Sequence, residues 1–144
     1  MVAIDINPKA LTIAKSNATN QQVRNIQFIQ SDLFSDVSKN EKFNVIVSNP
    51  PYISNTDYEK LTSIVKEQPK NALVAENDGY FFYQAIFQQA GNFLTEKFLL
   101  VVEIGHQQTE KVIKLIIEYF PQAKVSIYSD YAGRDRVITI TNNN

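Results

Sequence analysis

Short runs of apolar residues alternate along this chain with longer stretches in which apolar positions recur at helical spacing. The short runs predict β-strands at residues 2–4, 25–30, 43–47, 98–102 and 125–128. The longer stretches predict helices at residues 8–18, 55–66, 82–90 and 107–119. Because strands and helices alternate, we expect an α/β fold with right-handed crossovers and a mostly parallel sheet.

The last apolar stretch, residues 136–141, has a different pattern. Val137 and Thr139 alternate there with Ile138 and Ile140, which suits a strand with one buried face. We therefore expect a half-exposed, antiparallel last strand, followed by a frayed tail at 142–144. No repeat or low-complexity linker interrupts the sequence, so residues 1–144 are expected to belong to a single domain.

Composition narrows the classes of function. The 144 residues carry 14 Lys and Arg against 15 Asp and Glu, and the basic residues are scattered singly. Direct nucleic-acid binding is therefore not expected, since it usually requires clustered basic residues. The chain has no Cys and one histidine, His106, which argues against a metal site. We see no signal peptide or long apolar segment, and expect a soluble cytoplasmic protein without a membrane partner.

The most informative stretch, residues 45–52, joins an apolar run to an amide, two prolines and an aromatic ring. Pro50 and Pro51 end the predicted strand, because neither can donate a ladder hydrogen bond. Pro50 also pushes Asn49 into extended geometry. The Asn49 side chain and the Pro50 carbonyl are therefore expected just past the carboxyl end of a strand, where open α/β sheets bind ligands.

This arrangement suits methyl transfer to a planar nitrogen, which is a poor nucleophile because its lone pair is delocalised. The Asn49 side-chain oxygen and the Pro50 carbonyl would accept its two N–H groups, aim the lone pair at an electrophilic methyl group and stabilise the developing positive charge. Tyr52 would stack on the planar group. A strand-ending turn without chemistry is the alternative that the tetrapeptide alone leaves open.

Two acidic residues, Asp5 and Asp32, each follow a predicted strand. A carboxylate after the second strand of a nucleotide-binding βαβ unit commonly binds ribose hydroxyls. Asp32 would accept from an adenine amino group, with Leu33 packed on the ring. Each acid alone is also explained as a helix cap or a turn residue. Their placement with Asn49 on three successive strand ends favours a ligand site.

With these positions assembled, the chain resembles the S-adenosylmethionine-dependent N(5)-glutamine methyltransferases of the HemK family, which act on peptide chain release factors. The resemblance covers nearly all 144 residues. It is carried by Asp5-Ile6-Asn7-Pro8, Ser31-Asp32-Leu33, Asn49-Pro50-Pro51-Tyr52, Pro69, Ala72-Leu73, Asp78-Gly79, Glu103-Ile104-Gly105, Gln108, Asp130, Gly133 and Arg136. Other amino-methyltransferases share the tetrapeptide, whereas the later stretches are more specific.

The resemblance implies a Rossmann-like class I methyltransferase fold that binds S-adenosyl-L-methionine and methylates a glutamine side-chain amide in a release factor. It implies cofactor binding by Asp5, Asp32, Leu33 and Asn49, and catalytic roles for Asn49 and Pro50. The substrate glutamine would be bound by Asn49, Pro50, Pro51 and Tyr52. For Glu103, Gln108 and Arg136 we expect packing and loop anchoring rather than a catalytic step.

The chain departs from the family in two respects. Gln68 stands where the family usually has a Glu before the proline. The family's catalytic domain also begins with a strand, a glycine-rich loop and a helix, whereas the only glycines here are at positions 79, 91, 105 and 133. We therefore expect a partial domain, truncated at its N-terminus. The missing strand is expected between the strands of Ile4 and Ile46, and its loss would leave two apolar edges open to self-association.

Two other functions stay open. An adenine-N(6) or guanine-N(2) nucleic-acid methyltransferase would use the same Asn-Pro-Pro-aromatic turn. The acidic pI and the lack of basic clusters count against it. The other alternative is a non-catalytic remnant that keeps the fold without the cofactor site.

Overall fold

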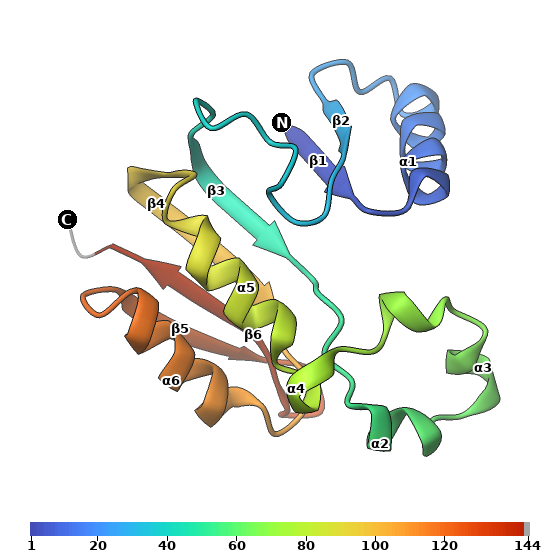
Figure 1. Cartoon of the computed structure of the whole chain (residues 1–144), viewed down its shortest axis with the longest axis vertical. Helices are drawn as coiled ribbons and strands as arrows, with labels where there is room; N and C mark the ends of the chain where they lie inside the picture. Colours follow the sequence, from blue (N-terminus) through green and yellow to red (C-terminus); the bar gives the residue numbers. More distant parts are fainter. Residues whose placement is uncertain (143–144) are drawn as a thin grey trace. The chain divides into compact units, whose positions relative to one another are not determined.

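The computed structural model describes residues 1–142, which fall into two compact units (Figure 1). Unit 1 is Met1–Glu41 and unit 2 begins at Lys42. Residues 143–144 of the predicted frayed tail lie outside the described residues. Asn142 lies within the described residues, and its side chain accepts a hydrogen bond from the Phe98 amide (3.4 Å) and donates one to the Glu96 carbonyl.

Unit 1 consists of β1 (Val2–Asp5), α1 (Pro8–Asn20) and β2 (Gln27–Gln30). The two strands pair in parallel, and α1 packs against both of them. The helix begins as predicted, with Pro8 in its first turn and the Asn7 side chain accepting from the Lys9 amide at 3.0 Å. Leu11 is the buried residue of α1, so a single apolar contact face orients the helix.

Unit 2 contains a four-stranded sheet in the order β3-β4-β6-β5. Its strands are β3 (Phe43–Ser48), β4 (Leu94–Glu103), β5 (Lys124–Ser129) and β6 (Asp135–Thr141). β3 and β4 are parallel, whereas β6 runs antiparallel to both of its neighbours, which confirms the predicted antiparallel last strand. β4 begins at Leu94 rather than 98, because Phe43 pairs with Leu94 ahead of the apolar run.

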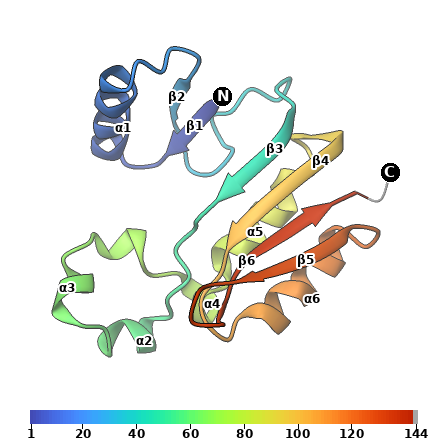
Figure 2. The same cartoon turned by 180° about the vertical axis from the view of Figure 1, so that it is seen from behind.

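Two helices, α5 (Phe81–Ala90) and α6 (Thr109–Tyr119), cover the same face of this sheet (Figures 1 and 2). The predicted alternation in β6 is confirmed, since Ile138 and Ile140 are fully buried whereas Val137 and Thr139 are partly exposed. The other large side chains of unit 2 that are fully buried are Tyr83, Phe87, Ile86, Leu100, Ile104, Ile116, Val102 and Val112.

An excursion between β3 and α5 holds only short helices: α2 (Asn55–Glu59), α3 (Ser63–Lys66), the 3₁₀ turn η1 (Lys70–Ala72) and α4 (Glu76–Gly79). The single helix predicted over 55–66 is therefore wrong. Thr62 is extended (φ −66°, ψ 155°), and neither α2 nor α3 buries a residue that would stabilise a longer helix. A parallel bridge between Ile53 and Val74 closes the base of the excursion.

The strands form two sheets rather than one. Among the described strands β1 pairs only with β2, and β3 pairs only with β4. Each of β1 and β3 therefore has an edge without a strand partner, as predicted. Val45 and Val47 of β3 are 53% and 72% exposed. None of the described helices is long and apolar enough to cross a membrane.

Candidate active site

The Asn-Pro-Pro-Tyr turn directly follows the carboxyl end of β3. The ladder between β3 and β4 reaches Ser48, which pairs with Val102, and the backbone leaves the sheet at Asn49. Pro50 is buried, whereas Asn49 is exposed. The prolines therefore end the strand as predicted and leave the Asn49 amide at the surface.

The turn contains two hydrogen-bond acceptors that the described part of the chain does not use. Within residues 1–142, no donor reaches the Asn49 side-chain oxygen or the Pro50 carbonyl. Tyr52 is different, because its carbonyl accepts from Gln108 Nε2 at 3.0 Å and its hydroxyl donates to Glu103 Oε1 at 3.2 Å. The turn thus presents two unoccupied acceptors beside an aromatic residue that is held at both ends.

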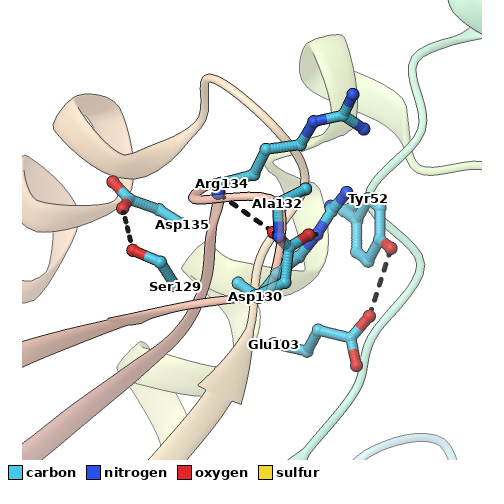
Figure 3. A network of polar contacts seen from close by, with 8 residues as sticks. Tyr52, Glu103, Ser129, Asp130, Ala132, Arg134 and Asp135 are labelled. Atoms are coloured by element: carbon cyan, nitrogen blue, oxygen red, sulfur yellow. Dashed lines mark hydrogen bonds and ion pairs between the residues drawn. The ribbon is translucent and has the colours of Figure 1, made fainter.

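The hydroxyl of Tyr52 lies against the Glu103 carboxylate (Figure 3). Partial burial raises the pKa of Tyr52 above its usual value of 10.0, and the Glu103 charge and hydrogen bond raise it further, although Arg136 opposes this. Tyr52 therefore stays protonated at neutral pH and keeps donating to Glu103. This contact fixes the ring that is predicted to stack on a planar substrate.

The turn between β5 and β6 is organised by Asp130 (Figure 3). Its carboxylate accepts from the backbone amides of Ala132 (2.9 Å) and Arg134 (3.0 Å), and from Arg136 Nε at 3.1 Å. These contacts, the Arg134 amide first, lower the pKa of Asp130 despite partial desolvation. Gly133 supplies the left-handed residue (φ +75°) that the turn requires. The Arg136 contact fits the loop-anchoring role expected for that residue.

In unit 1, the predicted cofactor residues Asp5, Asp32 and Leu33 lie at the carboxyl ends of the two parallel strands. Asp5 ends β1, and its carboxylate accepts from the Asn7 amide at 2.7 Å. Asp32 is exposed and follows the end of β2. Leu33 adopts a left-handed conformation (φ +50°), held by a 2.8 Å hydrogen bond from the buried Ser31 hydroxyl to its carbonyl.

Such backbone strain in a non-glycine residue costs roughly 1–3 kcal/mol and is typical of ligand-binding turns. The strain at Leu33 therefore supports a ligand site at the carboxyl ends of β1 and β2. Asn49 belongs to unit 2, so the four predicted cofactor residues come from both units, and their shared role stays a prediction.

Sequence reasoning assigned Glu103 and Gln108 to packing and loop anchoring, but it did not identify Tyr52 as the residue that they hold. Gln108 lies 56 positions further along the chain, and a buried glutamine looks like any surface glutamine in a sequence. Tyr83 reads only as one apolar position of a helix. The Asn77-Asp78-Gly79 turn was the one available signal, since a left-handed glycine marks a place where backbone approaches closely.

That close approach gives a direct stability prediction. Gly79 has φ +90°, and a Cβ there would lie 2.2 Å from the Tyr52 carbonyl oxygen. Gly79→Ala should lower the free energy of unfolding by at least about 2 kcal/mol, because left-handed geometry alone costs roughly 1–2 kcal/mol. Urea unfolding followed by circular dichroism would measure the loss.

Gly91→Ala is the matched control. Gly91 follows α5 with helical angles (φ −56°, ψ −29°), and a Cβ there would meet no atom within 4 Å. This variant should be neutral or gain up to about 1 kcal/mol through a less flexible unfolded chain. Equal destabilisation by both alanines would contradict the packing described for Gly79.

Known proteins resemble this chain in sequence and in fold. The family described as "Methyltransferase small domain" matches residues 1–77. A release factor glutamine methyltransferase of Fusobacterium nucleatum is 43% identical over 96% of this chain and 39% of its own length. The enzyme of the same name from Lactococcus lactis is 42% identical over 96% of this chain and 50% of its own length.

A solved structure has a similar fold. It is the release-factor-specific protein-(glutamine-N5) methyltransferase of Alicyclobacillus acidocaldarius, with a TM-score of 0.52 and 22% identity over 92% of this chain and 74% of that one. At this identity the likeness concerns the fold alone. The chain spans half or less of the length of these curated relatives.

Proposed function

This chain belongs to the methyltransferase small domain family and has its Rossmann-like α/β fold, and we propose that it is a catalytic portion of a glutamine methyltransferase. The enzyme would transfer a methyl group from S-adenosyl-L-methionine to the side-chain amide nitrogen of a glutamine in a peptide chain release factor. The curated relatives that bear this name support the substrate class. Because a release factor acts in translation termination, such a substrate would place the enzyme in the cytoplasm.

The observation that carries the proposal is the pair of unused acceptors at Asn49 and Pro50. A primary amide has two N–H groups and one delocalised lone pair. The Asn49 side-chain oxygen and the Pro50 carbonyl would accept one N–H each, which would turn the lone pair toward the methyl group of the cofactor. The same two oxygens stabilise positive charge as it develops on the nitrogen. Pro51 stiffens the turn, so both acceptors are preorganised.

The cofactor would supply the electrophilic methyl group. Unit 1 fits its adenosine half, because Asp5 and Asp32 offer carboxylate acceptors for hydroxyl and amino groups and Leu33 offers an apolar surface beside them. The methionine half has no glycine-rich cradle within residues 1–142. The residues present therefore fit part of the cofactor.

Among residues 1–142, none that contacts the turn is suited to remove the amide proton before methyl transfer. Tyr52 has a raised pKa, and its hydroxyl donates a hydrogen bond to Glu103. The Glu103 carboxylate is engaged by that same hydroxyl. We propose that Asn49 and Pro50 hold the neutral amide and that its proton leaves to water after the transfer.

This function is testable in a chimera that places the upstream part of the Fusobacterium nucleatum relative before residue 1. The chimera should add one methyl group to a release factor, detected on a glutamine by peptide mass spectrometry. A release factor in which that glutamine is replaced should not be modified. The proposal fails if a folded, cofactor-binding chimera leaves every glutamine of the release factor unmodified.

The same chimera separates the protein substrate from the rival nucleic-acid substrate. The chain has a net charge of −1 and no basic run, so it should bind duplex DNA or RNA weakly and with little salt dependence. Fluorescence anisotropy with a labelled duplex between about 50 and 200 mM salt measures both properties. Tight binding that weakens steeply over this range would favour the nucleic-acid methyltransferase.

A further inference from the structure

The side chain of Gln108 is enclosed at the start of α6. Only 9% of the residue is exposed. Its Oε1 accepts from the Gly105 amide at 2.9 Å. It also lies 3.2 Å from the Tyr83 hydroxyl, whose single proton is shared with the Glu103 carbonyl at 3.1 Å. A backbone amide can only donate, so Oε1 must face Gly105, and Nε2 must face the Tyr52 carbonyl at 3.0 Å. The network thus fixes which end of the Gln108 amide reaches the candidate active site.

Two glycines leave room for this contact and for little else. A Cβ at Gly79 would lie 2.9 Å from Gln108 Nε2, in addition to its clash with Tyr52. A Cβ at Gly105 would lie 2.6 Å from Gln108 Oε1 and 2.8 Å from Tyr52 Cδ2. Two separate turns, at Gly79 and Gly105, therefore have glycine where a side chain would collide with Gln108 and Tyr52.

Backbone strain concentrates at the same place. The non-glycine residues with positive φ described in unit 2 are Asn77 (53°), Asp78 (53°) and Gln107 (67°). The first two directly precede Gly79, and the third directly precedes Gln108. Asn and Asp tolerate this region, whereas at Gln107 it costs roughly 1–3 kcal/mol and persists only where the surroundings demand it. The turn that carries Gln108 is thus held in an unfavourable conformation by its contacts.

We propose that Gln108 is a positioning residue that sets the direction of the Pro50 carbonyl, one of the two acceptors in the Asn-Pro-Pro-Tyr turn. This inference rests on the proposed function. The Gln108 hydrogen bond fixes the Tyr52 carbonyl, and the Ile53–Val74 bridge fixes the next residue. On the other side, the φ angles of Pro50 and Pro51 are locked by their rings. Few freely rotating backbone torsions separate the Tyr52 carbonyl from the Pro50 carbonyl. Fixing the Tyr52 carbonyl therefore restricts the direction of the Pro50 carbonyl.

Gln108→Glu tests this role with almost no change of shape. When ionised, the introduced carboxylate would place a negative oxygen against the Tyr52 carbonyl, and the donor would be lost. At pH 8 the chimera's kcat for release factor methylation should fall about 10–100-fold, since a shift of about 1 Å can cost 10²-fold. The KM for the cofactor should stay within about twofold of the parent, because the Pro50 carbonyl is assigned to the substrate and not to the cofactor.

The pH profile distinguishes positioning from general damage. Burial raises the pKa of an introduced carboxyl group. Below that pKa the neutral acid regains an O–H that donates to the Tyr52 carbonyl, so the ratio of variant to parent kcat should rise as the pH falls from 8 to 6. Gln88→Glu is the matched control, since Gln88 is an exposed residue of α5 outside the turns around Tyr52 and gains the same charge. It should follow the parent at every pH.

Tyr83→Phe provides a second variant if Gln108→Glu does not fold. It keeps the buried ring and removes the hydroxyl that helps orient the Gln108 amide. Its kcat should fall severalfold with an unchanged cofactor KM. Circular dichroism would establish that both variants are folded at the assay temperature.

The outcomes separate the two proposals. A parent chimera that methylates no release factor would overturn the proposed function, and the positioning role with it. An active parent together with folded Gln108→Glu and Tyr83→Phe variants of equal kcat would overturn the positioning role alone. A loss of kcat in Gln108→Glu that does not recover toward pH 6 would also count against it.

Discussion

Replacing Asn49 by alanine should slow release factor methylation by the chimera about 10²–10³-fold, the usual cost of removing one preorganised polar group from a developing charge. The variant keeps the Pro50 carbonyl but loses the acceptor for the second amide N–H. The target nitrogen can then rotate, and its lone pair no longer faces the methyl donor. Single-turnover kinetics at saturating cofactor would isolate this effect from product release.

Stability should change little, because Asn49 is exposed and its side chain makes no hydrogen bond to residues 1–142. Asn17→Ala is the matched control, since Asn17 is an exposed residue of α1 far along the sequence from the turn. It should retain the parent rate. If Asn49→Ala stays within a few-fold of the parent, the proposed role of the turn is wrong.

The features that could be predicted from the sequence are those that neighbouring residues decide. Pro50 and Pro51 end β3 because each lacks a backbone donor, whatever surrounds them. Asn7 and Pro8 start α1 for equally local reasons. The antiparallel β6 is visible because Ile138 and Ile140 alternate with polar or smaller residues. These elements are encoded within a few residues of chain.

The features that could not be predicted depend on partners distant in sequence. The helix expected over 55–66 breaks at Thr62 because no part of unit 2 buries its apolar side. β4 starts at Leu94 because Phe43 pairs with it from 51 positions upstream, not because residues 94–97 are apolar. The contact between Gln108 and Tyr52 likewise depends on how β4 and α6 are placed. Local pattern alone contains none of this information.

The candidate site divides in the same way. The Asn49 and Pro50 acceptors follow from local geometry, and no donor within residues 1–142 reaches either of them, as the proposed chemistry requires. The groups that hold Tyr52 come from the turn after β4, which supplies Glu103 and precedes Gln108. The Asn-Pro-Pro-Tyr signature thus identifies the surface that would bind the substrate. The rigidity of this surface depends on the segment that contains Glu103 and Gln108.

Expressed alone, residues 1–144 should bind S-adenosyl-L-methionine several powers of ten more weakly than the chimera. Asp5, Leu33 and Asn49 are predicted to serve the adenosine half, whereas no glycine-rich loop serves the methionine half. Each lost hydrogen bond costs about 0.5–1.5 kcal/mol, and about 1.4 kcal/mol corresponds to a tenfold loss of affinity. The isolated chain should therefore also lack measurable methylation.

The isolated chain should self-associate as well. β1 and β3 each keep an edge without a strand partner among the described residues, and Val45 and Val47 of β3 are largely exposed. Strand pairing between two copies would satisfy the backbone groups of these edges and bury the valines. Supplying the upstream strand, glycine-rich loop and helix in the chimera should therefore restore cofactor binding and a monomeric state together.

Isothermal titration calorimetry with the cofactor and multi-angle light scattering, applied to both proteins, measure the two effects independently. A Val47→Lys variant of the isolated chain tests the edge directly, because a charged residue on an exposed strand opposes pairing between chains. It should shift the isolated chain toward monomer without restoring cofactor binding. Micromolar cofactor binding by a monodisperse monomer of residues 1–144 would contradict both expectations, since the residues present would then bind the whole cofactor and the free strand edges would not associate.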